Sequence, residues 1–268
     1  MKKYEAVEII TNCAKEYRAY LEDNNFLFIF GDKHRTEAFE TIFLPRNFLH
    51  LTGVKLKSTC ESSDFYEMCL KGQLSPSLFE MSADGTTDMK LCVLPQLMKI
   101  HRTAKMIGEY DQSKSFLVTE KIAGNVTACL GFVREEGYYI PNTALREDIR
   151  NVTVKPQQRI LAIFKKNSKA LYYTNLCYTA KNVKIDTMKV PESISQKIDF
   201  NNIIFDFPVT SNCSCLMKQN RPMDEVLMAT EDAAASSSIV ERIKKTKDAQ
   251  VKDQIKNEHP IPKRQHTR

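Results

Sequence analysis

Residues 39–56 read FETIFLPRNFLHLTGVKL, and the rest of the chain is expected to fold around this stretch. In Phe39–Leu44 every second residue falls on the same face, the spacing of a strand that is buried on at least one side. Pro45 ends the strand because it has no amide hydrogen to donate. Asn47 is then expected to cap a short helix over 48–52, and Gly53 to end it.

This turn carries three polar side chains, Arg46, His50 and Thr52, next to large apolar residues. A cation, an imidazole and a hydroxyl gathered on a rigid element are what phosphodiester chemistry without a metal requires. The alternative is that His50 is a hydrogen-bonded histidine of the core, inside an apolar helix.

The first half of the chain is rich in helical periodicity. Apolar residues at helical spacing predict an amphipathic opening helix over residues 2–22. The apolar run 26–30 and the strand 38–44 are expected to pair as a hairpin across the turn Gly31-Asp32. Helical segments are predicted at 65–71 and 86–105, the second of them kinked or split at Pro95.

From Ser115 onward the period changes to that of strands. Short β-rich runs lie at 116–121, 126–134, 138–140, 159–165 and 170–178, separated by turn residues. Pro141-Asn142-Thr143 is expected to lead into a small helix over 144–150. Helices followed by a meander of antiparallel strands predict the α+β class.

Composition and charge narrow the class of protein further. The chain has 268 residues, 42% of them hydrophobic and 27% charged, and a net charge of +6, which permits a polyanionic partner. No apolar run reaches the roughly 20 residues that span a bilayer. The first ten residues lack the apolar segment of a signal peptide. The eight cysteines show no CxxC spacing, although Cys213 and Cys215 with Cys177 form a weak zinc pattern. We therefore expect reduced thiols, a cytoplasmic location, no membrane and no bound metal.

The chain is expected to divide near residue 188. Residues 1–188 carry the strands and helices described above, whereas 189–268 lose any firm period. Residues 238–256 have the pattern of a polar helix with a thin apolar stripe, and the last ten are basic with two prolines. We expect this tail to dock a partner or to act as a linker.

The sequence lacks the phosphate-binding loop, GxGxxG, HExxH and GxSxG, so four common enzyme classes are set aside and no cofactor is expected. What remains is a set of cations, histidines and hydroxyls near strand ends. RNA cleavage needs little more, because the substrate's 2′-hydroxyl is the nucleophile. The alternative is that these are solvated residues that protect strand edges. The set is His34, Arg35, Arg46, His50, Thr52, Asn142, Thr143, Arg146, Arg150, Lys165, Lys166, Tyr173 and Thr174.

Three segments in order resemble a known family. They are FLPRNFLHLTGV, LGFVREEGYYIPNTALREDIR and QRILAIFKKNSKALYYTNLCY. Together they are similar to the phage-associated members of the Barnase–EndoU–colicin–RelE-like nuclease superfamily, over roughly residues 4–185. The resemblance implies a compact α+β domain whose N-terminal helix and helical insert pack on a curved antiparallel sheet. It also implies a metal-independent endoribonuclease that serves as a toxin or as an effector of a phage or mobile element.

The resemblance also implies roles for single residues. His50 would be the general acid or base, with His34 as a second candidate. Arg46 and Arg150 would bind phosphate, and Lys165 or Lys166 would stabilise charge in the transition state. The remaining predicted substrate contacts are Arg35, Thr52, Asn142, Thr143, Tyr173 and Thr174.

Three functions remain open at this point. The first is cleavage of cellular RNA, with tRNA or mRNA as the target and a neutralising antitoxin or phage protein as a partner. The second is a catalytically inactive module that binds nucleic acid or protein. The third is nucleotidyl or ADP-ribosyl transfer, for which no paired Glu or Ser-Thr-Ser motif is found on a strand.

Overall fold

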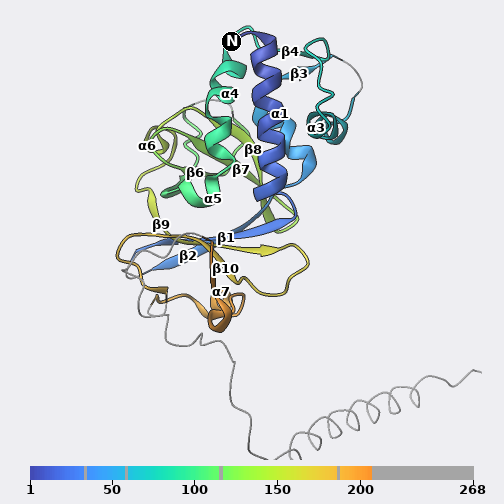
Figure 1. Cartoon of the computed structure of the whole chain (residues 1–268). Helices are drawn as coiled ribbons and strands as arrows, with labels where there is room; N and C mark the ends of the chain where they lie inside the picture. The colour runs from blue at the N-terminus through green and yellow to red at the C-terminus, as the bar shows by residue number, and fades with distance from the viewer. Residues whose placement is uncertain (33–34, 58–59, 115–116, 186–187, 207–268) are drawn as a thin grey trace, which may run out of the picture. The chain divides into compact units, whose positions relative to one another are not determined.

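The computed structural model describes residues 1–32, 35–57, 60–114, 117–185 and 188–206. Helices and one large mixed sheet make up this part of the chain (Figure 1), which confirms the predicted α+β class. The predicted helical tail lies outside the described residues.

The chain opens with a helix and a hairpin, as predicted. Helix α1 (Lys3–Tyr20) is amphipathic and buries Ala6, Ile10, Cys13, Ala14 and Tyr17. Strands β1 (Asn24–Gly31) and β2 (Thr36–Ile42) pair antiparallel across the predicted turn.

The turn after β2 also forms as predicted, with one correction. Pro45–Asn47 is a 3₁₀ turn (η1), and Phe48–Thr52 is helix α2, which ends at Gly53 with φ +71°. Glycine adopts that left-handed conformation more readily than other residues because it has no Cβ. Asn47 does not cap α2 through its side chain; its Oδ1 instead accepts a hydrogen bond from the Leu44 amide at 3.3 Å. The side chain thus ties the turn back to the end of the strand.

The helical insert follows. It consists of β3 (Lys55–Leu56), α3 (Ser62–Leu70), β4 (Phe79–Glu80), α4 (Thr86–Leu97) and α5 (Ile100–Thr103). Pro95 lies near the end of α4, and a separate helix begins at Ile100, so the predicted segment over 86–105 is split. Strands β3 and β4 pair only with each other.

The middle strands differ from the prediction at one place. They are β5 (Met106–Glu109), β6 (Lys121–Gly124), β7 (Cys129–Glu135) and β8 (Tyr138–Leu145). The predicted helix over 144–150 is wrong: β8 runs on to Leu145, and only α6 (Ile149–Val152) is helical. The register shifts opposite Asn142, so Pro141 pairs with Phe132 and Thr143 with Gly131. A bulge of this kind lets a strand contain a proline.

The last described elements form the second hairpin and a short segment that packs on the sheet beyond it. Strands β9 (Gln158–Asn167) and β10 (Asn175–Thr179) pair antiparallel. Helix α7 (Glu192–Ser195), the 3₁₀ turn η3 (Phe200–Asn202) and strand β11 (Ile204–Phe205) follow, with β11 parallel to β10.

The strand pairings close a ring. The sheet order is β1-β2-β8-β7-β6-β5-β9-β10-β11, and β1 also pairs with β9. The link between β2 and β8 is a single parallel pair, Thr41 with Tyr139. The sheet is therefore curved and mostly antiparallel, with parallel pairings at β2–β8 and β10–β11.

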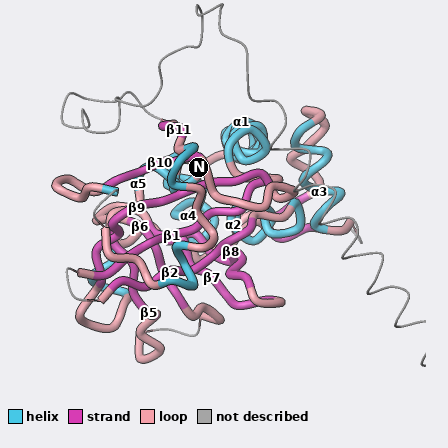
Figure 2. Tube along the Cα trace, turned by 90° about the horizontal axis from the view of Figure 1, so that it is seen from below, coloured by secondary structure: helices cyan, strands magenta, loops and turns pink. Residues whose placement is uncertain are grey.

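Strand β1 separates two hydrophobic cores because successive side chains point to opposite faces. Phe26, Phe28 and Phe30 join the main core with α1, α2, α3 and α4. Leu27 and Ile29 join a smaller core, which the segment with α7 covers on the far side of the sheet in Figure 1. Figure 2 shows α1 and α3 to one side of the strands. The run FLFIF is thus buried on both faces.

Candidate active site

A pocket of about 400 Å³ lies between the turn after β2 and the strands β7 and β8. Three of the predicted site residues line it: Arg46, His50 and Asn142. The other lining residues are Asn47, Ser62, Val118, Val133, Glu135 and Ile140. The fold thus brings a guanidinium, an imidazole, a carboxylate and an amide into one concave surface.

The turn that carries Arg46 and His50 rests on a buried aromatic cluster. Tyr17 is fully buried, and its ring lies 5.3 Å from that of Phe48 and 5.9 Å from that of Phe43. Its hydroxyl donates a hydrogen bond to the Leu44 carbonyl at 2.9 Å. Edge-on aromatic pairs and a satisfied buried hydroxyl both favour one fixed geometry. The backbone of the turn is therefore anchored directly beneath the pocket.

His50 lies on the outer face of α2. Its residue is exposed, so the alternative that it belongs to the core is wrong. The Lys90 ammonium donates a hydrogen bond to the His50 carbonyl at 2.9 Å, which fixes the backbone at this position. Among the described residues the imidazole has no hydrogen-bond partner, so both ring nitrogens are available to a ligand.

Glu135 is the charged residue of the pocket that sequence reasoning did not single out. It ends β7 and forms a hydrogen-bonded ion pair with Arg46, which lies 89 positions earlier in the chain. Both side chains are about half exposed, at 51% for Arg46 and 42% for Glu135. No local pattern marks such a pair, because it exists only once β7 lies beside the turn.

Asn142 sits at the bulge of β8. Its Oδ1 accepts a hydrogen bond from the Thr119 hydroxyl at 3.0 Å, and its amide nitrogen donates to the Val118 carbonyl. The neighbouring Thr143 is buried, and its hydroxyl has no hydrogen-bond partner in the described part of the chain. Asn142 lines the pocket, whereas the predicted substrate contact of Thr143 is not possible from its buried position.

Thr52 is also a structural residue. It is fully buried, and its hydroxyl donates to the Leu49 carbonyl at 2.7 Å and accepts from the Val54 amide at 3.3 Å. These bonds close the end of α2, and they leave no exposed hydroxyl for a substrate.

The side chains of Lys165 and Lys166, the two lysines of β9, contact different groups. Lys165 Nζ lies 3.4 Å from Asp206 Oδ2, whereas Lys166 Nζ donates to the Leu171 carbonyl at 3.1 Å and lies 4.9 Å from the centre of the Tyr173 ring. Adjacent residues of a strand point to opposite faces, and these contacts follow that rule. Neither lysine lines the pocket that holds His50.

Lys165 belongs to a second polar cluster, with Arg102, Asp206 and the buried His101. Arg102 lies 3.1 Å from the same carboxylate oxygen of Asp206. Burial opposes ionisation of Asp206, yet the hydrogen bond from Arg102 and the charge of Lys165 outweigh it and lower the pKa of that carboxyl. His101 is 2% exposed and its Nδ1 has no partner among the described residues. Burial, and then the charges of Arg102 and Lys165, lower the pKa of His101 to about 4.

The hydroxyls of Tyr173 and Thr174, which were predicted to contact the substrate, form hydrogen bonds within the protein. Tyr173 is fully buried, and its hydroxyl donates to Glu40 at 3.0 Å. Lys197 pairs with the same carboxylate at 2.7 Å. Thr174 is half-buried and donates to Asn175 at 3.3 Å. Tyr173 thus joins the smaller core and is not at the surface for a substrate.

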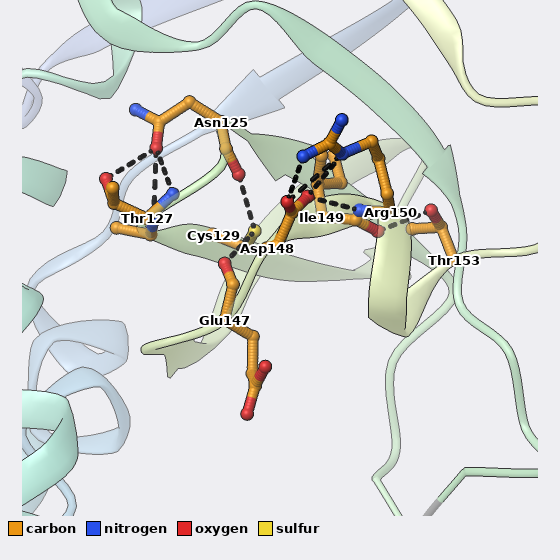
Figure 3. A network of polar contacts seen from close by, with 9 residues as sticks. Asn125, Thr127, Cys129, Glu147, Asp148, Ile149, Arg150 and Thr153 are labelled. Carbon is orange, nitrogen blue, oxygen red and sulfur yellow. Dashed lines mark hydrogen bonds and ion pairs between the residues drawn. The ribbon is translucent and has the colours of Figure 1, made fainter.

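Arg150 lies in a separate network near α6 (Figure 3). Asp148 caps α6 by accepting a hydrogen bond from the Arg150 amide, and its carboxylate also pairs with the Arg150 guanidinium. The Cys129 thiol donates to the Glu147 carbonyl nearby. Arg150 does not line the pocket that holds His50. Its predicted contact with phosphate would therefore lie outside that pocket.

Two more of the predicted residues, His34 and Arg35, lie in the sequence between β1 and β2. Arg35 is exposed, and its guanidinium lies 2.9 Å from Glu37. His34 lies outside the described residues. In the part of the chain that the structure describes, no group of three His, Cys, Asp or Glu side chains is placed to hold a metal ion, and no helix is both long and apolar enough to cross a membrane.

Comparison with known proteins supports the resemblance drawn from the three segments. The model of the family described as phage-Barnase-EndoU-ColicinE5/D-RelE like nuclease4 matches residues 9–182, which is more than half of the chain. Every residue that lines the pocket falls within this range. No curated protein and no solved structure gave a significant match.

Proposed function

We propose that this chain, which belongs to the phage-Barnase-EndoU-ColicinE5/D-RelE like nuclease4 family, cleaves RNA without a bound metal, by attack of a 2′-hydroxyl on the adjacent phosphodiester. The observation that carries this proposal is the pocket that gathers His50, Glu135, Arg46 and Asn142. Members of a nuclease family act on nucleic acid, and these four side chains supply each kind of group that the reaction needs.

The reaction can be written with these groups in named roles. Glu135 takes the proton of the 2′-hydroxyl as that oxygen attacks the phosphorus. The bond from phosphorus to the 5′-oxygen breaks, and His50 gives that oxygen a proton, since an imidazole can carry one near neutral pH. The products are a 2′,3′-cyclic phosphate and a free 5′-hydroxyl.

Arg46 is suited to the charge that develops on the phosphate. A guanidinium has five N–H donors in a fixed fork. The ion pair with Glu135 uses part of this fork, and Arg46 lines the pocket. The remaining donors can bind the non-bridging oxygens, and the amide of Asn142 can hold the sugar or the base.

The substrate is proposed to be an unpaired stretch of RNA. A base that is not stacked in a duplex can enter a small pocket and present its 2′-hydroxyl in line. Loops of tRNA and stretches of mRNA meet this requirement. The phage in the family's description supports a role as an effector of a phage or mobile element, where a neutralising partner protein would protect the host that makes it.

The assignment of Glu135 gives a direct test. Changing Glu135→Gln removes the base but keeps the size of the side chain, and we expect the cleavage rate to fall by about 10²–10⁴-fold. The measurement is the initial rate on a labelled single-stranded RNA in excess EDTA. Glu136→Gln, at the exposed neighbouring position, is the matched control and should cut at the wild-type rate.

Two results would count against the proposal. An equal loss of cleavage rate in the Glu135→Gln and Glu136→Gln variants would show that Glu135 is not the general base. RNA that is bound but not cut by the wild-type chain would favour the inactive binding module instead.

A further inference from the structure

A second and larger pocket, of about 690 Å³, lies at the other end of β2. Gly31 and Thr36, which pair across the β1–β2 turn, form one wall. Arg159 at the start of β9, which pairs with Gly31, and the segment that follows β10 form the other. None of its lining residues is shared with the pocket of His50.

This pocket has an apolar floor and a basic rim. Leu161, Val183 and Met188 supply apolar surface. Cations come from separate segments, with Arg159 on β9 and Lys189 after β10. Ligand pockets of this size combine a mostly apolar lining with a few placed polar groups. The combination suits a ligand that has a flat apolar part and a negative charge.

Arg159 is held in position for such a ligand. Its guanidinium donates one hydrogen bond to the Lys181 carbonyl at 2.7 Å. That carbonyl is a fixed backbone group, so the bond orients the fork without neutralising its charge. The other donors of the guanidinium stay free to bind an anion within the described part of the chain.

The lining favours binding over catalysis. Among the described residues that form the pocket, Asp32 is the one carboxylate and no imidazole is present. Proton transfer needs a matched acid and base, whereas electrostatic binding of a phosphate needs only cations.

We propose that this pocket is a second nucleotide site, which holds the base of an unpaired RNA residue on Met188 and Leu161 and its phosphate on Arg159 and Lys189. The proposal rests on RNA as the substrate. It adds a second place on the protein that holds the RNA, away from the phosphodiester that is cleaved. The seven residues of β2 rise about 3.3 Å each, so the two pockets lie about 20 Å apart along the strand. A single nucleotide cannot fill both, and an oligonucleotide is the ligand.

The test measures binding apart from cleavage. A fluorescein-labelled, 2′-O-methylated single-stranded RNA of about ten nucleotides lacks the nucleophilic hydroxyl, and its anisotropy reports affinity for the full chain. We expect Arg159→Gln with Lys189→Gln to weaken binding about tenfold and to reduce the slope of log K against log salt by about 1. Met188→Glu should weaken binding similarly, because it places a negative charge on the floor.

A matched double variant on α1, Lys15→Gln with Arg18→Gln, removes the same charge from an exposed surface elsewhere. Thermal unfolding of each variant verifies that the fold is intact, and Arg159→Lys, which keeps the charge, should retain most of the affinity. The proposal is overturned if the pocket variant and the α1 variant bind alike, or if the wild-type chain does not bind the RNA. Binding by the wild type without cleavage of unmodified RNA would overturn the proposed reaction and leave this site standing.

Discussion

Replacing His50 by alanine is expected to lower the rate of RNA cleavage by about 10²–10⁴-fold, the usual loss when a general acid or base is removed. The imidazole is exposed at the edge of the pocket, so the substitution leaves no cavity and should change stability little. The measurement is the single-turnover rate on an unpaired RNA.

A second histidine variant supplies the control. His101→Gln removes an imidazole that does not line the pocket, and at neutral pH this variant should cut RNA at close to the wild-type rate. Added imidazole should restore part of the activity of His50→Ala, since the emptied position is open to solvent. An unchanged rate in His50→Ala would show that another group transfers the proton.

His101 itself should make folding stability depend on pH. Its pKa is about 4 in the folded chain, below its ordinary value of 6.5, so the unfolded chain takes up the proton first as the pH falls. The stabilisation is therefore complete above about pH 6.5 and is lost progressively down to about pH 4. At 1.36 kcal/mol for each pH unit, the loss amounts to about 3 kcal/mol.

The comparison of wild type with His101→Gln isolates this contribution. Denaturant unfolding at several pH values should give curves that diverge as the pH falls from 6.5 to 4, with the wild type losing about 3 kcal/mol more than the variant. Parallel curves would mean that the imidazole can take up a proton in the folded state. In that case Asp206, which favours the charged imidazole, would outweigh burial and the charges of Arg102 and Lys165.

The parts of the fold that local chemistry determines were predictable. Pro45 and Gly53 delimit the turn that carries Arg46 and His50, because one lacks an amide hydrogen and the other adopts a positive φ. The run FLFIF identified a strand, which the structure then shows to be buried on both faces. The continuation of β8 through Pro141 was missed, because the bulge that accommodates the proline depends on the register with β7.

The site was predictable only in part. Arg46 lies in the 3₁₀ turn η1 and His50 in α2, four positions later, so one short stretch of chain brings both to the pocket. Glu135 could not be predicted, because its partner is distant in sequence and one glutamate among many carries no signal. Lys165 and Lys166 were grouped although strand alternation separates them, and this rule was available from the sequence.

The ends of the RNA products test the proposed reaction most directly. The measurement is mass spectrometry of a single-stranded RNA after digestion by the full chain in excess EDTA. The proposed mechanism predicts a 2′,3′-cyclic phosphate on the upstream product and a 5′-hydroxyl on the downstream one. It also predicts no cut where the upstream nucleotide is 2′-deoxy. Products with 5′-phosphate ends, or cleavage at the deoxy position, would contradict attack by the 2′-hydroxyl.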